Sequence, residues 1–194
     1  LPMIIYNVPG RTAVNISAET QLRLAEDCPN IVASKEASGN LTQMMEIIRN
    51  APDGFDLLSG DDALTLPVIS IGGKGIVSVI SNYAPKEFSD MVRLGLNGRF
   101  DEARKIHYSL FELMELNFME SNPIPVKAAM NAMKLCRDTV RMPLLPMSSK
   151  NNTVMRKALE TAALMQPKKK EACNTLISIP LRLSSKEFLS RHYY

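Results

Sequence analysis

The sequence predicts an α/β fold built on a parallel sheet that is covered on both faces, either a doubly wound sheet or a barrel. Four short apolar runs rich in Ile, Val and Leu recur in the first 80 residues, and stretches with helical spacing separate them. The runs do not alternate apolar with polar residues, which is typical of strands buried on both faces. The length of 194 residues and a hydrophobic content of 45% suffice for one ordinary domain with a core.

The first half of the chain contains the expected strands. We place them at residues 1–6, 31–35, 55–59 and 75–80. Pro9-Gly10 is expected to form a turn, and Ser17 to cap a helix that Pro29 stops. A second helix is expected at 41–50, closed by Pro52 and Gly54. A third, at 63–71, is short or irregular because it contains Pro67.

From Pro85 onward the pattern becomes helical. Apolar residues at helical spacing predict one segment around Phe88 to Val92, a longer one from Phe100 to Met114, and further helices at 126–135 and 153–164, with a loop at 141–146 between them. We therefore expect three parts: a β/α region at 1–84, a helical region at 85–165, and a basic tail at 166–194.

The charge distribution argues against a nucleic-acid partner. The tail from Gln166 holds six Lys or Arg against two Glu, so the net charge of +3 for the whole chain leaves −1 for the first 165 residues. Three scattered cysteines, Cys28, Cys136 and Cys173, fit neither a disulfide framework nor a CxxC metal site. No apolar run is long enough for a membrane span, and no signal peptide is recognisable. We expect a cytoplasmic protein without a membrane partner.

Lys35 is the main candidate for chemistry, because it ends an apolar run, where an unpaired ammonium is costly to bury. An apolar environment favours the neutral amine, which attacks a carbonyl to form an imine. The position of Lys35 alone leaves a second interpretation equally open. In that interpretation the aliphatic part of its side chain is buried, and its ammonium pairs with Glu36 or reaches solvent.

Two residues could assist Lys35, since sites of parallel α/β folds gather at the carboxyl ends of strands. Tyr6 ends another run and could relay protons, although a tyrosine there is more often a packing residue. Arg11 follows in the next loop and could clamp a carboxylate, although a lone loop arginine is usually a surface charge.

Weaker candidates have simpler explanations. The segment 72–75 (GGKG) precedes a strand and lacks the Ser or Thr of a phosphate loop, so we expect a tight turn. Asp61 and Asp62 are better explained as helix-end charges than as metal ligands. His107 and His192 lack ligand-like neighbours. We expect no metal and no cofactor.

The segments Tyr6–Thr12 (YNVPGRT) and Lys35–Asn40 (KEASGN) resemble the two hallmark segments of dihydrodipicolinate synthases. Three further segments are similar to that family in the same order: 57–62 (LLSGDD), 75–79 (GIVSV) and 122–127 (NPIPVK). The resemblance runs from residue 1 to about 165. It implies a (β/α)₈ barrel of which this chain holds the last four β/α units, followed by a helical C-terminal region, and a homotetramer built from tight dimers.

The resemblance also implies an activity and roles for single residues. The family is a group of lyases that condense pyruvate with aspartate semialdehyde in the diaminopimelate pathway of lysine biosynthesis, without a cofactor. Lys35 would hold pyruvate as a Schiff base and Tyr6 would relay protons. Arg11 would bind the semialdehyde carboxylate, Val77 would line the pyruvate pocket, and Gly60 would belong to the substrate-binding residues.

Two features depart from the family pattern. Leu1 enters an apolar run with no preceding turn or cap, so we expect the family's N-terminal half, with its Gly-Thr-Thr-Gly-Glu segment, to be absent from this chain. The tail from Gln166 does not resemble the family's ending. Alternatives therefore remain: an N-acetylneuraminate lyase or keto-deoxy sugar-acid aldolase, which keep the Lys and Tyr, or a noncatalytic half-barrel that acts as an interaction module.

Overall fold

The computed structural model describes residues 1–165. These residues divide into two compact units. Unit 1 consists of residues 1–78 and 89–104, and unit 2 consists of residues 79–88 and 105–165. The predicted tail at 166–194, with Cys173 and His192, lies outside the described residues, and the predicted boundary at residue 84 stays a prediction.

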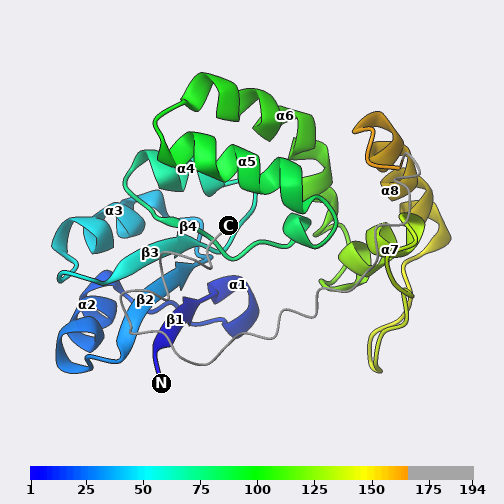
Figure 1. The fold of residues 1–194 in the computed structure, drawn as a ribbon. Coiled ribbons are helices and arrows are strands. Elements are labelled where there is room, and N and C mark those ends of the chain that lie inside the picture. The colour runs from blue at the N-terminus through cyan, green and yellow to red at the C-terminus, as the bar shows by residue number, and fades with distance from the viewer. Residues whose placement is uncertain (166–194) are drawn as a thin grey trace. The chain divides into compact units, whose positions relative to one another are not determined.

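Unit 1 is built on a four-stranded parallel sheet, as the apolar runs predicted (Figure 1). The strands are β1 (Met3–Asn7), β2 (Ile31–Glu36), β3 (Asp56–Ser59) and β4 (Gly75–Ile76), and they lie in the order β1-β2-β3-β4. In the register, Tyr6 lies beside Lys35, and Glu36 lies beside Ser59, which lies beside Ile76. The carboxyl ends of all four strands therefore meet at one edge.

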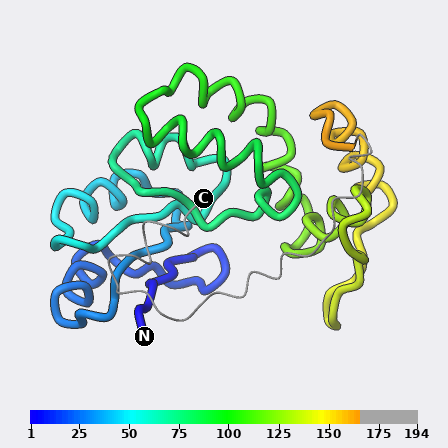
Figure 2. Tube along the Cα trace, in the orientation of Figure 1, coloured from blue at the N-terminus to red at the C-terminus, as the bar shows by residue number. Residues whose placement is uncertain are grey.

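Helices α2 (Ala18–Asp27), α3 (Leu41–Asn50) and α4 (Thr65–Ser70) follow one another along one side of this sheet (Figures 1 and 2). Their apolar side chains form the core of unit 1 with residues at the start of β3 and just before it, and its buried members are Ala18, Ala25, Met44, Ile47, Phe55, Leu57 and Val68. Burial of each large apolar side chain stabilises the fold by roughly 1.5–3 kcal/mol.

Side-chain caps fix where two of these helices begin. The Ser17 hydroxyl accepts a hydrogen bond from the backbone N–H of Thr20 at 3.3 Å, so the predicted cap is confirmed. Asn40 caps α3 in the same way, through the backbone N–H of Gln43 at 3.1 Å. Helix α2 ends at Asp27, before Pro29, as expected, and α4 has only six residues around Pro67.

Two predictions in this region were wrong. The strand predicted at 75–80 ends at Ile76, and a 3₁₀ turn, η1 (Ile80–Asn82), follows. The run is apolar because side chains such as Ile80 are fully buried, and a buried apolar run cannot by itself distinguish a strand from other buried backbone. Instead of the turn predicted at Pro9-Gly10, the chain forms the short helix α1 (Pro9–Thr12), whose first position suits proline.

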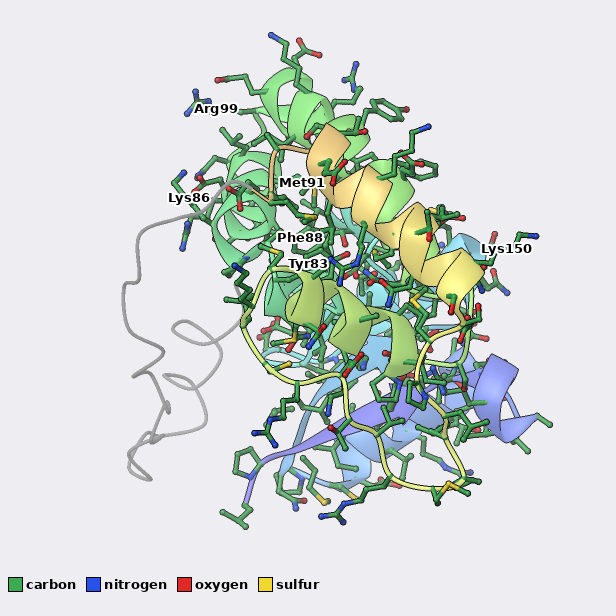
Figure 3. All side chains as sticks on the ribbon, turned by 90° about the vertical axis from the view of Figure 1, so that its right-hand side faces the viewer. Tyr83, Lys86, Phe88, Met91, Arg99 and Lys150 are labelled. Carbon is green, nitrogen blue, oxygen red and sulfur yellow. The ribbon has the colours of Figure 1, made fainter. Side chains whose placement is uncertain are left out.

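Helices α5 (Pro85–Leu96) and α6 (Phe100–Leu116) confirm the two predicted helical segments. Phe88 and Met91 lie one turn apart on α5 and are both fully buried, whereas Lys86 projects away from them (Figure 3). Gly98 turns the chain between the helices with a φ of 74°, which a glycine adopts without strain.

Unit 2 contains α7 (Ile124–Ala132) and α8 (Ser149–Thr161), which pack against each other. Both predicted helices exist, but each begins earlier than expected. Pro125 lies in the first turn of α7, a position that proline tolerates, and the Ser148 side chain caps α8. Each residue therefore belongs to the start of a helix and not to a loop. Residues 133–148 form an irregular connection that includes the predicted loop at 141–146 (Figure 2). Of the helices described, none is both long and apolar enough to cross a bilayer.

Candidate active site

Lys35 and Tyr6 lie side by side at the carboxyl edge of the sheet. They are paired in the β1–β2 register, and the Lys35 Nζ lies 3.9 Å from the centroid of the Tyr6 ring. This separation is typical of a cation–π contact. Tyr6 is 46% exposed and Lys35 is half-buried, so an amine and a phenol adjoin in a place that a small molecule can reach.

The structure excludes one alternative for Lys35. Glu36 is the next residue of β2, and side chains alternate between the two faces of a strand, so its carboxylate points toward α2 and α3. Its hydrogen-bond partners are amides and a hydroxyl, and within residues 1–165 neither Lys35 nor Glu36 takes part in an ion pair. The interpretation that Glu36 neutralises Lys35 is therefore wrong.

The Glu36 carboxylate is the centre of a buried polar network. Its Oε1 accepts hydrogen bonds from the side-chain amides of Asn7 (2.8 Å), Gln21 (2.6 Å) and Gln43 (3.2 Å), and its Oε2 accepts one from the Ser38 hydroxyl (2.6 Å). Asn7, Gln21 and Glu36 are each at most 1% exposed. Such complete hydrogen bonding offsets the cost of removing a carboxylate from water.

Sequence reasoning missed this network, although a signal for it existed. Gln21 and Gln43 lie on helix faces that turn toward the sheet, where their neighbours Ala25 and Ile47 are apolar core residues. Polar residues on the core face of two successive helices indicate a buried partner, and Glu36 in an apolar run is that partner.

Gly60 lies at the same edge, where β3 approaches the end of β2. Its backbone N–H donates to the Glu36 carbonyl at 2.7 Å. A Cβ at this position would come within 2.7 Å of the Ala37 Cβ and 3.1 Å of the Glu36 carbonyl oxygen. The absence of a side chain therefore allows the backbone after β3 to lie directly beside the residue that follows Lys35 and Glu36.

Val77 and Arg11 also occur at this edge, each in the segment that follows a strand. The backbone N–H of Val77 donates to the Ser59 carbonyl at 3.0 Å, and its side chain is 39% exposed. Arg11 lies on α1, directly after β1, and is exposed. Its guanidinium forms neither an ion pair nor a hydrogen bond within residues 1–165.

The other sequence candidates have structural explanations. Gly72 has a φ of 111°, and a Cβ on Gly73 would come within 2.5 Å of Val68, so the glycines permit a tight turn before β4, as predicted. The Asp61 carboxylate accepts the backbone N–H of Ala63 at 2.8 Å, close to the start of α4. Within residues 1–165 no cluster of His, Cys, Asp or Glu is suited to a metal.

His107 is buried on α6 in unit 2, beside the rings of Tyr108 and Phe111 at centroid distances of 5.3 and 5.7 Å. Its Nδ1 has no hydrogen-bond partner among the described residues, and burial lowers the pKa of its imidazole. His107 is therefore a neutral packing residue.

The amino end of the sheet is chemically different. A cavity of about 260 Å³ lies there between Ile47, Phe55, Asp56 and Lys74. Burial raises the pKa of the Asp56 carboxyl, and the nearby Lys74 charge lowers it in part. No tyrosine lines this cavity within residues 1–165, so the pairing of an amine with a phenol at the carboxyl edge has no counterpart here.

The arrangement at the carboxyl edge suits imine chemistry. A lysine amine that attacks a carbonyl needs a neighbour that takes up and returns protons while water leaves, and the Tyr6 ring that contacts the Lys35 amine carries a hydroxyl of this kind. An exposed guanidinium after β1 is available for a carboxylate.

Comparison with known proteins connects this geometry to a family. Residues 1–162 match the model of the dihydrodipicolinate synthetase family. The 4-hydroxy-tetrahydrodipicolinate synthase of Phocaeicola vulgatus is 54% identical over 146 residues, which cover 75% of this chain and 49% of that protein. The chain thus spans about half the length of this curated relative.

Solved structures agree. The dihydrodipicolinate synthase from Aquifex aeolicus superposes with a TM-score of 0.83 at 43% identity, over 87% of this chain and 57% of that chain. A structure described as a monomeric dihydrodipicolinate synthase variant superposes with a TM-score of 0.82 at 38% identity, over 84% of this chain and 56% of that chain. Together with the lysine–tyrosine pair at the sheet edge, these matches show that the chain belongs to the dihydrodipicolinate synthetase family.

Proposed function

We propose that this chain carries the Schiff-base half of a 4-hydroxy-tetrahydrodipicolinate synthase, which condenses pyruvate with L-aspartate 4-semialdehyde. The observation that carries the proposal is the contact between the Lys35 amine and the Tyr6 ring at the carboxyl edge of a parallel sheet. The names of relatives about 50% identical to the chain support the choice of substrates.

The chemistry begins at the Lys35 nitrogen, which attacks the C2 carbonyl of pyruvate. Water leaves, and the resulting iminium acts as an electron sink, so that a proton can depart from C3 to give an enamine. The enamine C3 then forms a bond to the aldehyde carbon of the semialdehyde. Finally, the amino group of the bound product displaces Lys35 from C2, which closes the ring and frees the lysine. Tyr6 transfers the protons of these steps through its phenol.

Three further residues are assigned to substrate binding. Arg11 binds the semialdehyde carboxylate through two parallel hydrogen bonds, and its freedom from other partners supports this role. Val77 lines the pyruvate pocket with its half-exposed side chain. Gly60 keeps that space open, because any side chain there would collide with Ala37.

The whole protein is proposed to be larger than this chain. The four parallel strands would be the last four of a (β/α)₈ barrel, with unit 2 as part of its C-terminal helical region. The protein is proposed to act in the cytoplasm, and Cys28 and Cys136, which are free, are compatible with a reducing compartment. A homotetramer is the expected assembly, and size-exclusion chromatography with light scattering separates it from a monomer.

The activity is tested in a chimera that joins this chain to the N-terminal half of the Phocaeicola vulgatus synthase, because the chain spans about half the length of that relative. We expect the chimera to consume pyruvate and aspartate semialdehyde together, and Lys35→Ala to abolish the reaction. A chimera that cleaves N-acetylneuraminate or keto-deoxy sugar acids, and ignores the semialdehyde, would replace this assignment with a sugar-acid aldolase.

Arg11→Ala in the chimera tests the choice of aldehyde. We expect a rise in KM for the semialdehyde, because a charged hydrogen-bond pair to its carboxylate is lost, while the pyruvate imine still forms. Unchanged semialdehyde kinetics would remove Arg11 from the site.

A further inference from the structure

The Glu36 carboxylate connects the strand that carries Lys35 to the strand that carries Tyr6. Glu36 follows Lys35 in β2 and Asn7 follows Tyr6 in β1, and the Asn7 amide donates to Glu36 Oε1 at 2.8 Å. The same two residues are paired through the backbone, since the N–H of Ala37 donates to the Asn7 carbonyl at 2.9 Å. One buried side-chain pair thus joins the two strands directly behind the contact between Lys35 and Tyr6.

Asn7 is held in a single orientation. Its Oδ1 accepts the backbone N–H of Ile16 at 3.0 Å, and its Nδ2 donates to Asn15 Oδ1 at 2.8 Å as well as to Glu36. Each of these bonds would be lost if the side chain rotated. Because the Asn7 backbone cannot move without breaking them, the preceding residue, Tyr6, is held as well.

Glu36 is held equally firmly from the helix side. Gln21 on α2 donates to Oε1, and its own oxygen accepts the Ser34 hydroxyl at 2.6 Å, so α2 is attached to β2 at two successive inward positions. Gln43 on α3 adds a third donor to Oε1. The carboxylate therefore has a fixed position relative to both helices and both strands.

We propose that Glu36 and Asn7 are positioning residues that hold the Tyr6 phenol against the Lys35 amine. The inference rests on the proposed Schiff-base function and assigns no contact with substrate to either residue. A proton relay requires accurate placement of its two groups, and misplacement by about 1 Å lowers rates by up to roughly 100-fold.

Two of the four groups that donate to the Glu36 carboxylate allow a test that distinguishes the positioning of Tyr6 from general stabilisation of the fold. Asn7 and Gln21 donate to the same oxygen over nearly the same distance, 2.8 and 2.6 Å, and both are buried. Only Asn7 lies on the strand that carries Tyr6. Asn7→Ala and Gln21→Ala are therefore a matched pair, in which each removes one amide from Glu36 Oε1.

The first experiment measures the Lys35–Tyr6 contact in the chain itself, without any activity. Ring current from Tyr6 shifts the NMR signal of the Lys35 ε-methylene upfield, and Lys35→Arg and Tyr6→Leu assign that signal. We expect Asn7→Ala to move the signal toward those of the other lysines and Gln21→Ala to leave it in place. An unchanged shift in folded Asn7→Ala would overturn the proposal.

The second experiment uses the chimera and follows kcat separately from KM. We expect Asn7→Ala to lower kcat roughly 10- to 100-fold with a KM for pyruvate within about twofold of the parent value, because proton transfer is impaired while pyruvate contacts remain. Gln21→Ala is expected to keep kcat within about twofold. Equal losses of kcat in the two variants at equal stability would contradict a positioning role.

Glu36→Gln tests whether geometry or charge is responsible. The amide oxygen can accept the three amide donors, and its NH₂ can donate to the Ser38 hydroxyl, so the network can persist without the charge. We expect Glu36→Gln to retain the shifted Lys35 signal and Glu36→Leu to lose it. A folded Glu36→Gln variant that loses the contact as fully as Glu36→Leu would overturn the proposal.

The two proposals fail in different ways. If the parent chimera forms no pyruvate imine on Lys35, the proposed function is wrong, whereas the NMR experiment still decides whether Asn7 and Glu36 fix the contact. If the imine forms and the Asn7 and Gln21 variants behave alike, the function stands and the positioning role falls.

Discussion

The two units of the chain bury polar groups in different ways. In unit 1 five of the buried polar residues, Asn7, Gln21, Ser34, Glu36 and Gln43, form one network in which every member has partners. In unit 2 the buried polar residues His107 and Asn117 each leave one nitrogen without a partner among the described residues. The Asn117 Oδ1 accepts a hydrogen bond from the Tyr83 hydroxyl at 3.1 Å, and Leu113 and Met114, nearby in the sequence, are fully buried.

This difference shows in which part of the fold buried polar groups fix the positions of side chains. A fully satisfied network costs little and fixes the positions of its members, whereas an unpaired buried atom costs stability and fixes nothing. The satisfied network lies directly behind Lys35 and Tyr6, where the proposed imine chemistry requires accurate geometry.

The largest contrast is expected when a buried polar side chain is replaced by leucine in each unit. Gln21→Leu leaves the Ser34 hydroxyl and one bond of Glu36 without a partner, so we expect a loss of about 2–4 kcal/mol in the free energy of unfolding. His107→Leu removes a nitrogen that already lacks a partner, and its cost should be within about 1 kcal/mol. Urea unfolding of both variants measures this, and equal losses would refute the distinction between the units.

The backbone at the sheet edge provides a second, smaller contrast. Gly60→Ala places a Cβ 2.7 Å from that of Ala37 and should cost about 1–3 kcal/mol, with the ends of β2 and β3 moved apart. Gly10→Ala is the control, because nothing lies within 4 Å of its Cβ position. Thermal unfolding measures the stability of both variants. A Gly60→Ala variant as stable as Gly10→Ala would show that the ends of β2 and β3 can move apart without a loss of stability.

These sites also show what the sequence could and could not predict. Lys35 and Tyr6 were singled out because strand ends and family segments mark them, and the parallel register confirms that they lie side by side. The Glu36 network was missed, because hydrogen bonds between Asn7, Gln21 and Gln43 depend on the packing of α2 and α3 against the sheet. Likewise, the end of β4 at Ile76 is set by the turn toward η1, which no local pattern encodes.

Acid should weaken unit 2 through His107. Burial lowers the pKa of this imidazole in the folded protein, so as pH falls the unfolded chain takes up the proton first. The stability that the neutral His107 contributes is therefore fully present above the ordinary imidazole pKa of 6.5 and is lost as the pH falls below that value. Amide hydrogen exchange of α6 at pH 7.5 and pH 5.5 should show lower protection at the acidic pH. His107→Leu should remove the part of this pH difference that protonation of His107 causes. If His107→Leu showed the same pH response as the parent chain, another titratable group would be its cause.

The smallest effect is expected at Glu120, also in unit 2. Its Oε1 accepts hydrogen bonds from the Ser148 hydroxyl (2.8 Å), the Asn151 amide (2.7 Å) and the Ser148 backbone N–H (3.1 Å), and the bond from the Ser148 hydroxyl is the main cause of its lowered pKa. The carboxylate therefore adds stability above the ordinary pKa of 4.5, and this is lost as pH falls below that value. Because Glu120 is largely solvated, Glu120→Gln should lower the protection of α8 only slightly at pH 7 and by still less at pH 3.5. A large loss at both values would indicate a packing role instead.

The central claim is that Lys35 is the imine-forming residue, and borohydride trapping with pyruvate tests it most directly. In the chimera, hydride should convert the transient imine into a stable secondary amine, and peptide mass mapping should place the reduced pyruvate adduct on Lys35. Tyr6→Phe should slow turnover strongly while some trapping persists, because the relay is lost but the nucleophile remains. An adduct on another lysine, such as Lys74 or Lys127, with Lys35 unmodified, would contradict the account.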